Sequence, residues 1–230
     1  MQQNKIQTIS ATPTMERHEH AHAYAAIVLS GGYEEAGDRG RFLARPGDVI
    51  LHEAFEAHLN RFSAAGATVI NVPLPHDAEF QFGAGRISDL DQVIRAFERG
   101  GEVPSAIVLS GLQMTSPIVL DWPDELAAAL QHNPSLPLSR WAEERGLKPW
   151  ALSRGFLRVF GTSAASFRAR ARARCSWKAI RHTHEPLASI AVRLGFSDQA
   201  HMTRAIKRLT RATPKSWRCA ANGFKTHLAR

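Results

Sequence analysis

The sequence predicts an α+β protein with a strand-rich N-terminal part and an all-helical C-terminal part. Short apolar stretches separated by turns occupy residues 23–75, which is typical of a sandwich or a small barrel. From Trp122 onward the apolar residues follow a helical period. The charge divides near the same place: Lys and Arg number 9 against 17 Asp and Glu up to Asn133, and 20 against 4 after it. This asymmetry predicts two domains with different partners, and the basic one suits nucleic acid.

Turn residues mark the strands of the first predicted domain, residues 1–75. AYAAIVLSGG is an apolar run closed by two glycines, and RFLARPGDVILH carries a Pro-Gly-Asp turn between two apolar stretches. ATVINVPLP is a further strand bounded by prolines. Because Gly, Pro and Asp favour turns, these runs are expected to be short strands of one domain.

Residues 76–121 are expected to be a helical linker. Apolar residues recur there at steps of 3, 4 and 3, as one face of a helix requires: Ile87, Leu90, Ile94 and Phe97. The helix predicted over 87–99 is the candidate for homodimer formation. Packing of this helix on the preceding strands is the alternative.

The last predicted domain, residues 122–230, contains two similar units, each a short helix, a turn with glycine and a second helix. The second unit is PLASIAVRLGFSDQAHMTRAIKRLT. Gly195 stands where its first helix ends, and Ser197 is the expected N-cap of the next helix. On that next helix a polar stripe steps by four: Gln199, Thr203 and Lys207. Such a polar, hydrogen-bonding face is what a helix needs in the major groove of DNA.

The first unit, PLSRWAEERGLKPWALSRGFLRVFG, repeats this arrangement. Its turn falls at Gly146, and Trp150, Ser153 and Arg154 are left on or near the outer face of its second helix. Between the units, SAASFRARARARCSWKAIRHT is predicted to be one helix, because Ala and Arg are strong helix formers. About twenty residues span roughly 30 Å, close to the ~34 Å repeat of the major groove. Its arginines are expected to contact phosphate or to pair with glutamates: Arg168, Arg170, Arg172 and Arg174, with Glu143, Glu144 and Glu185.

The segment GFSDQAHMTRAIKRLTRATPKSWR resembles the signature of the AraC/XylS (arabinose-regulator) family of bacterial transcription factors. The matching positions are Gly195, Phe196, Ser197, His201, Arg204, Lys207, Thr213, Pro214, Trp217 and Arg218. The first unit is similar at Ala142, Gly146, Leu147, Leu152, Ser153, Arg154, Phe156, Phe160, Gly161 and Phe167. This sequence departs from the family at Lys148-Pro149, where a capping Ser is usual, and at Gly155.

The resemblance covers about Trp122–Arg218 and implies two helix-turn-helix subdomains joined by a long helix. It implies binding to double-stranded promoter or operator DNA, with RNA polymerase as a further partner of an activator. The residues expected to bind DNA are Trp150, Ser153, Arg154, Gln199, Thr203, Arg204 and Lys207.

The N-terminal part is similar to the small cupin-type sensor domain of the same family. The matching residues are His20, His22, Ser30, Gly31, Pro46, Gly47, Asp48, His58 and Asn60. The resemblance implies a small cupin-type β-barrel that binds a small effector, followed by helices that dimerise the protein. The expected effector-binding residues are His20, His22 and His58.

The same histidines are the candidates for a metal site. His18, His20 and His22 alternate, so an extended strand places them on one face. Three His and a carboxylate suit Zn, Fe, Ni or Mn, and cupin enzymes hold a divalent metal in a similar way. Glu34 and Glu35, however, follow Gly-Gly-Tyr in what is expected to be a turn. A metal-free organic effector and no cofactor are therefore the preferred prediction, with a divalent metal as the alternative.

The predicted function is a cytoplasmic, sequence-specific transcriptional regulator, not an enzyme. The sequence contains no run of about 18 apolar residues, so no membrane span is predicted, and the N-terminus lacks the apolar core of a signal peptide. Cys175 and Cys219 do not make a disulfide framework. One alternative is a metal-dependent cupin enzyme fused to a nucleic-acid-binding domain. In such an enzyme the basic half would have no role in the reaction. A non-specific architectural protein explains the charge but not the two polar outer faces.

Overall fold

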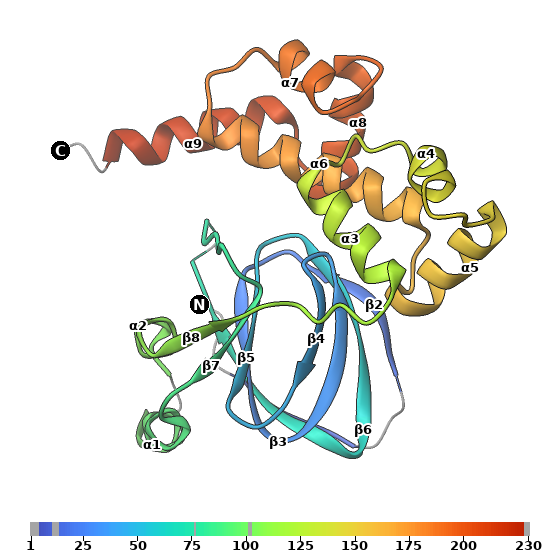
Figure 1. The fold of residues 1–230 in the computed structure, drawn as a ribbon. Coiled ribbons are helices and arrows are strands. Elements are labelled where there is room, and N and C mark those ends of the chain that lie inside the picture. Colours follow the sequence, from blue (N-terminus) through green and yellow to red (C-terminus); the bar gives the residue numbers. More distant parts are fainter. Residues whose placement is uncertain (1–4, 11–13, 76, 101–102, 228–230) are drawn as a thin grey trace. The chain divides into compact units, whose positions relative to one another are not determined.

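The computed structural model describes residues 5–10, 14–75, 77–100 and 103–227. The chain divides into two compact units, the first made of residues 1–125 and 158–161 and the second of 126–157 and 162–230. The first unit is built on an antiparallel sheet and the second is helical (Figure 1), which confirms the predicted α+β class. Among the helices of the described residues, none has the length and apolar character that a membrane crossing requires.

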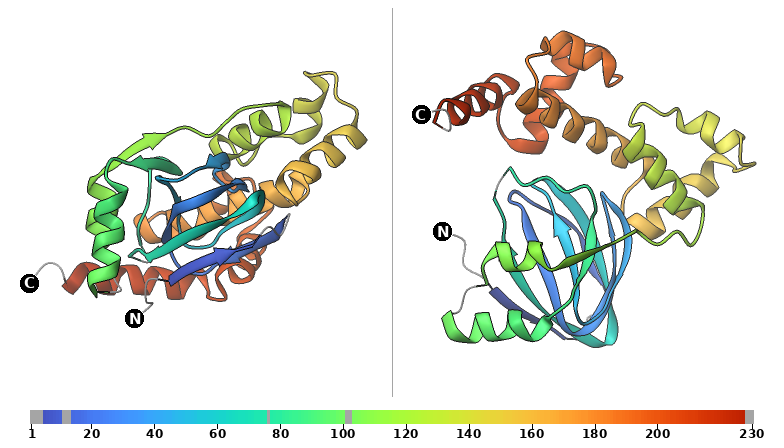
Figure 2. Two further views of the ribbon diagram at one scale, coloured as in Figure 1. Left: turned by 90° about the horizontal axis from the view of Figure 1, so that it is seen from below. Right: turned by 60° about the vertical axis from the view of Figure 1, so that its left-hand side comes forward.

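In the described part of the first unit, eight strands form one sheet. They are β1 (Lys5–Ile9), β2 (Met15–His20), β3 (Tyr24–Gly37), β4 (Gly40–Ala44), β5 (Asp48–His52), β6 (Glu56–Pro73), β7 (Ala84–Ile87) and β8 (Leu112–Thr115). The long strands β3 and β6 pair with each other from end to end, with register shifts between Val28 and Ser30 and between Gly31 and Tyr33. Such irregularities bend a strand, and β3 and β6 curve visibly (Figure 2). On one side of the shifts β1 and β5 flank this pair, and on the other side β2 and β4 do.

The segment 76–121 adds two strands to this sheet, which the helical interpretation of the linker missed. β7 pairs with β5, and β8 pairs with β7. Each has four residues, too few to show a period of two in the sequence, and their hydrogen bonds come from neighbours distant in the chain. Ile87, expected at the start of a helix, is the last residue of β7.

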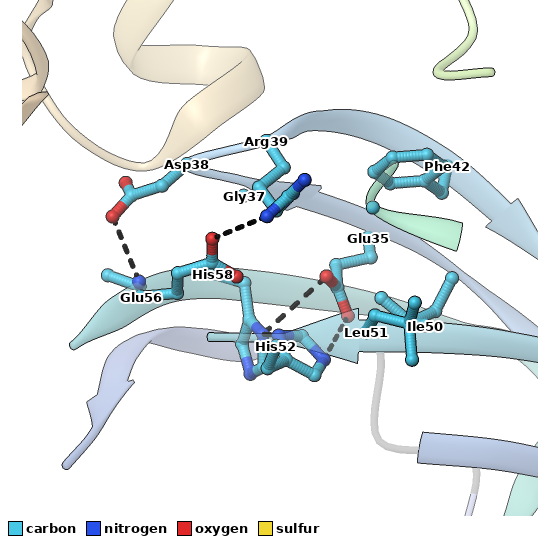
Figure 3. A pocket seen from close by; sticks show the side chains of 12 residues that line it. Glu35, Gly37, Asp38, Arg39, Phe42, Ile50, Leu51, His52, Glu56 and His58 are labelled. Carbon is cyan, nitrogen blue, oxygen red and sulfur yellow. Dashed lines mark hydrogen bonds and ion pairs between the residues drawn. The ribbon is translucent and has the colours of Figure 1, made fainter. Parts of the chain in front are cut away.

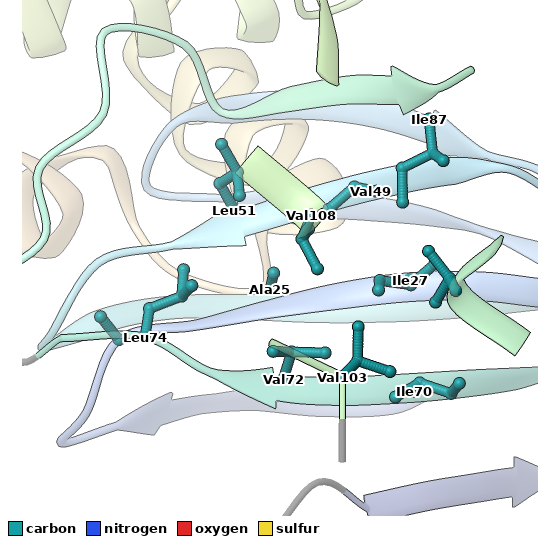
Figure 4. Packing of buried hydrophobic residues seen from close by; sticks show 12 residues of the cluster. Ala25, Ile27, Val49, Leu51, Ile70, Val72, Leu74, Ile87, Val103 and Val108 are labelled. Atoms are coloured by element: carbon teal, nitrogen blue, oxygen red, sulfur yellow. The ribbon is translucent and has the colours of Figure 1, made fainter. Parts of the chain in front are cut away.

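Two helices of the same segment pack on one face of the sheet. They are α1 (Leu90–Gly100) and α2 (Ser105–Ser110), and their buried residues Val93 and Val108 join a core with Val103. The sheet side of this core (Figure 4) consists of alternate residues, among them Ala25 and Ile27, Val49 and Leu51, and Ile70 and Val72. The helix considered for dimerisation therefore packs on the strands.

Among the described residues from Trp122 onward there are seven helices. They are α3 (Trp122–His132), α4 (Leu138–Glu143), α5 (Pro149–Phe160), α6 (Ala164–His182), α7 (Leu187–Arg193), α8 (Gln199–Thr210) and α9 (Pro214–His227). α6 is the long helix predicted between the two units, with 19 residues. It begins after Ser163, whose hydroxyl accepts a hydrogen bond from the Ser166 N–H at 3.1 Å.

Ile70 and Ile6 provide a matched test of the sheet core. They face each other across the β1–β6 ladder, yet Ile70 is 1% exposed and Ile6 is 42% exposed. Ile70→Ala should lower the free energy of unfolding by about 2–5 kcal/mol, because it leaves a cavity in a packed core. Ile6→Ala should change it by about 0.5 kcal/mol or less. Urea unfolding of the full chain, followed by circular dichroism, measures both, and equal effects would contradict this core.

The turns between α4 and α5 and between α7 and α8 provide a second matched pair. Gly146 and Gly195 have φ values of 64° and 75°, in the left-handed region. A Cβ at Gly146 meets no atom within 4 Å, whereas one at Gly195 lies 2.7 Å from Ser135 Oγ. Gly146→Ala should therefore lower the free energy of unfolding only by the cost of the left-handed backbone conformation for alanine, about 1–2 kcal/mol. Gly195→Ala should cost more in the same unfolding experiment, and Ser135→Ala should recover part of the difference. A Gly195→Ala protein no less stable than Gly146→Ala would be contrary to the described packing.

Candidate nucleic-acid interface and histidine pocket

The second helix-turn-helix unit, α7 and α8, is held by a continuous apolar core. Its buried members are Ile180 of α6 with Ile190, Ala191, Leu194, Phe196, Met202 and Ile206. Trp217 of α9 packs against this cluster, and its indole Nε1–H donates to Thr210 Oγ1 at 2.8 Å. The inner face predicted for α8 is thus confirmed.

The N-cap of α8 is Asp198, and the prediction of Ser197 is wrong by one residue. The Asp198 carboxylate accepts a hydrogen bond from the His201 N–H at 2.6 Å. This bond is the main reason that the pKa of Asp198 lies below its ordinary value. Both residue types are good caps, so the sequence alone does not choose between them. The carboxylate also places negative charge at the positive end of the α8 dipole.

The outer face of α8 carries the polar side chains expected to read DNA. Gln199, Arg204 and Lys207 are exposed and Thr203 is half-buried, while Met202 and Ile206 on the opposite face are completely buried. Within the described part of the chain, no hydrogen bond or salt bridge engages the side chains of Gln199, Thr203 or Lys207. These groups are therefore available to a ligand outside the helix.

The first unit, α4 and α5, has the same division into two faces. Trp141, Leu152 and Phe156 are buried, and the Phe156 ring meets Phe167 of α6 edge-on with centroids 5.3 Å apart. The expected outer residues are indeed exposed: Trp150 (65%), Ser153 and Arg154. The Arg154 guanidinium lies 6.0 Å from the centre of the Trp150 ring.

Leu157 belongs to the same outer face of α5 and was missed from the sequence. It is 52% exposed, three residues after Arg154, so the two side chains are neighbours on the helix. A leucine is normally assigned to the buried face. Leu152, Phe156 and Phe160 recur every four residues and define the buried face of α5. Leu157 does not fit this period, and that is the signal in the sequence that places it on the outer face.

Two arginines of α6 bind backbone carbonyls within the second unit. Arg168 donates to the Leu136 carbonyl at 3.0 Å, and Arg172 donates to the Pro134 carbonyl at 2.8 Å. Both carbonyls belong to the connection between α3 and α4. Two of the three glutamates expected to pair with these arginines have other partners: Glu144 pairs with Arg140 and Glu185 with Arg193.

The first unit contains a small cavity lined by histidines from three strands. Its volume is about 60 Å³, room for a few water molecules. Its lining includes His18 and His20 of β2, His52 at the end of β5 and His58 of β6. His22 is exposed and lies beyond the end of β2, so the expectation that it shares the pocket with His20 and His58 is wrong. An extended strand would have aligned all three, but β2 ends at His20.

Glu35 is the carboxylate of this cluster. It lies inside β3, paired with Phe42 of β4 on one side and Asn60 of β6 on the other, and is only 3% exposed. The turn expected after Gly-Gly-Tyr does not exist, because β3 continues through it to Gly37. Glu34, the next residue along the strand, points away from the histidines and pairs with Arg61 at 2.7 Å. The argument against a carboxylate ligand is therefore overturned.

Glu35 lies between two histidines (Figure 3). Its Oε1 is 3.6 Å from His58 Nδ1, and its Oε2 is 3.6 Å from His52 Nε2. Burial places the pKa of His52 well below its ordinary value, and the neighbouring His58 lowers it further. Burial likewise lowers the pKa of His20 to about 4, and it also lowers the pKa of His18. The lowered pKa values favour the neutral form of these three imidazoles, in which one ring nitrogen is an acceptor.

Comparison with known proteins identifies the helical unit. Residues 141–220 match a family model described as a helix-turn-helix domain, and no curated protein matches the chain. Among solved structures, the C-terminal domain of AraT, a response regulator from Geobacillus stearothermophilus, is 23% identical, with coverage of 43% of this chain and 84% of that one and a TM-score of 0.40. ToxT from Vibrio cholerae is 10% identical, with coverage of 94% and 97% and a TM-score of 0.43. TM-scores below 0.5 support no further conclusion.

The family match extends from α4 to α9 and so includes both helix pairs. In each pair the second helix, α5 or α8, buries one face and exposes the polar residues expected from the sequence. This agreement confirms the resemblance stated for the helical half. Residues 141–220 match a helix-turn-helix domain, and the chain is a DNA-binding transcriptional regulator.

Proposed function

We propose that this regulator reads DNA in a sequence-specific manner by placing α5 and α8 in successive major grooves. The observation that carries the proposal is the pair of exposed polar faces, each backed by a buried apolar face, on either side of the 19-residue α6. At about 1.5 Å per residue α6 spans roughly 28 Å, close to the ~34 Å of one helical turn of DNA.

The side chains of α8 suit direct contact with base edges. Arg204 matches the two acceptors of guanine, and Gln199 matches the donor and acceptor of adenine. Thr203 lies between them along the helix with a hydroxyl and a methyl group. Lys207, two turns after Gln199, is suited to a phosphate. On α5, Ser153 and Arg154 offer polar contacts beside the exposed ring of Trp150.

The N-terminal unit is proposed to be a sensor that takes a small ligand in the histidine cavity. Buried polar atoms without hydrogen-bond partners, among them His20 Nε2 and His52 Nε2, support this role. A homodimer and contact with RNA polymerase, both in the cytoplasm, belong to the same proposal. Exposed apolar side chains at Met114, Val119 and Leu120, between 45% and 66% exposed, offer more apolar surface to a second chain than α1 does.

Selection of bound duplexes from a random pool tests the reading by two helices. The full chain should enrich a bipartite motif whose two elements lie about one helical turn, roughly 10 base pairs, apart. A single short element would show that only one helix reads bases. Enrichment of no motif would support the non-specific architectural alternative.

Substitutions on α8 test the assignment of base contacts. Arg204→Ala or Gln199→Ala should each weaken binding to the selected site by about 1–3 kcal/mol and weaken binding to random duplex less. The matched control is Arg95→Ala, an exposed arginine of α1 in the other unit, which should change neither affinity. Fluorescence anisotropy at one fixed salt concentration measures all three proteins. Equal losses on both duplexes would place Arg204 and Gln199 on phosphates.

A further inference from the structure

Glu35 and His52 are buried, and each has a polar atom without a partner in the described part of the protein. Glu35 Oε2 and His52 Nε2 have no hydrogen-bond partner among the described residues, although both side chains are about 3% exposed. The two nearby arginines are engaged elsewhere: Arg39 pairs with Glu53, and Arg41 pairs with Asp124. A buried carboxylate without a cation or a donor is strongly unfavourable. A cation between Glu35 Oε2 and His52 Nε2 would satisfy both atoms.

The direction of the histidine hydrogen bonds shows where this partner belongs. His18 Nδ1 lies 2.8 Å from the Glu16 carbonyl, which can only accept, so His18 carries its proton there and its Nε2 is an acceptor. When each ring holds one proton, His58 must donate through Nε2 to His18 Nε2, at 2.9 Å. His52 must then donate through Nδ1 to His58 Nδ1, at 3.1 Å.

This chain of donors leaves one imidazole lone pair on the side that faces Glu35. His52 Nε2 keeps its lone pair and lies 3.6 Å from Glu35 Oε2, whereas His58 Nδ1, 3.6 Å from Glu35 Oε1, uses its lone pair to accept from His52 Nδ1–H. An acceptor thus faces an acceptor in a buried position (Figure 3). A protonated Glu35 does not resolve the conflict, because an O–H donor lies about 2.5–3.0 Å from its acceptor and the distance is longer.

The distances fit a metal ion. Two ligand atoms bound at about 2.1 Å to a tetrahedral ion lie roughly 3.4 Å apart. The ligand atoms of Glu35, His52 and His58 all lie within 4.8 Å of one another, and the two nitrogen–oxygen distances are 3.6 Å. Two imidazoles and one carboxylate are a ligand set for a divalent transition-metal ion.

We propose that Glu35, His52 and His58 bind one divalent transition-metal ion, with Zn²⁺ as the probe ion, and that this ion is the ligand of the sensor pocket. The inference rests on the sensor role proposed above, since it names the ligand of that pocket. The adjoining cavity of about 60 Å³ has room for a water molecule as the fourth ligand.

The surroundings of the three ligands support this assignment. The outer nitrogen of His58 is oriented by His18, which is oriented in turn by the Glu16 carbonyl. Such outer hydrogen bonds are what holds the ring of a metal-binding histidine in place. The His52 ring is stacked on Tyr24, with centroids 4.4 Å apart and an angle of 18° between the planes. Three strands, β3, β5 and β6, therefore hold the three ligands side by side, and His58 Nδ1 would exchange its hydrogen bond from His52 Nδ1–H for the ion.

The test uses the full chain, purified without a histidine tag, stripped with a chelator and titrated with Zn²⁺ in a calorimeter. One ion per chain is expected. Glu35→Gln and His52→Ala should each weaken Zn²⁺ binding at least about tenfold. His22→Ala is the matched control, an exposed histidine just after β2, and should bind as the unchanged protein does. Co²⁺ in place of Zn²⁺ should give a visible absorption spectrum of a four- or five-coordinate ion, which Glu35→Gln should alter.

Three results would overturn the proposal. The first is the absence of Zn²⁺ binding by the unchanged chain, and the second is full retention of binding in Glu35→Gln. The third is loss of Zn²⁺ binding in His20→Ala without any loss in Glu35→Gln. The last would place the ion among His18, His20 and His58, which also lie close enough together. Thermal unfolding of each metal-free variant checks its fold, and the nearly isosteric Glu35→Gln decides if His52→Ala does not fold. Metal binding is measured without DNA, so the DNA-binding proposal can fail or hold independently.

Discussion

The antiparallel pairing of β3 with β6 is the constraint on which the N-terminal unit depends, because the other strands of its sheet are attached to this pair directly or, for β7 and β8, through β5. The register shifts near Gly31 bend the pair and give each half its own neighbours. Beyond the bend, Glu35 pairs with Asn60 and Gly37 with His58. A slip of one residue would turn Glu35 to the opposite face, away from His52 and His58. The polar cluster is thus a consequence of strand register.

Alternation along the same strands separates two environments. Ala25 and Ile27 of β3 face the core that α1 and α2 cover, while Ala26 and Val28 belong to a second apolar cluster with Ile50 and Val69. The histidine cavity continues this second side, since its lining includes Ala26 and Val69. Burial of polar groups there is unfavourable by itself. The burial of apolar side chains in the two clusters offsets the free-energy cost of burying these polar groups, and a bound cation would remove the electrostatic part of that cost.

In the helical unit, α6 has a role comparable to that of the β3–β6 pair. Phe167 near its start packs against Phe156 of the first helix pair, and Ile180 near its end joins the core of the second. Arg168 and Arg172 bind carbonyls of the α3–α4 connection. A helix that belongs to two cores orients both, so the exposed faces of α5 and α8 are presented by one rigid element. Arginines placed on α6 for DNA by charge alone are in part structural residues.

The sequence by itself determined the helical half, because its signals are local. A period of 3.6 residues, a glycine at each turn and the residues exposed on α5 and α8 can all be read within a window of about ten residues. The sequence also predicted a strand-rich first part and a cluster of histidines. Only the tertiary structure decided that Glu35 lies in a strand beside His52 and His58, that His22 lies outside the pocket, and that β7 and β8 complete the sheet. Those outcomes depend on pairing between segments far apart in the chain, which no local pattern of residues encodes.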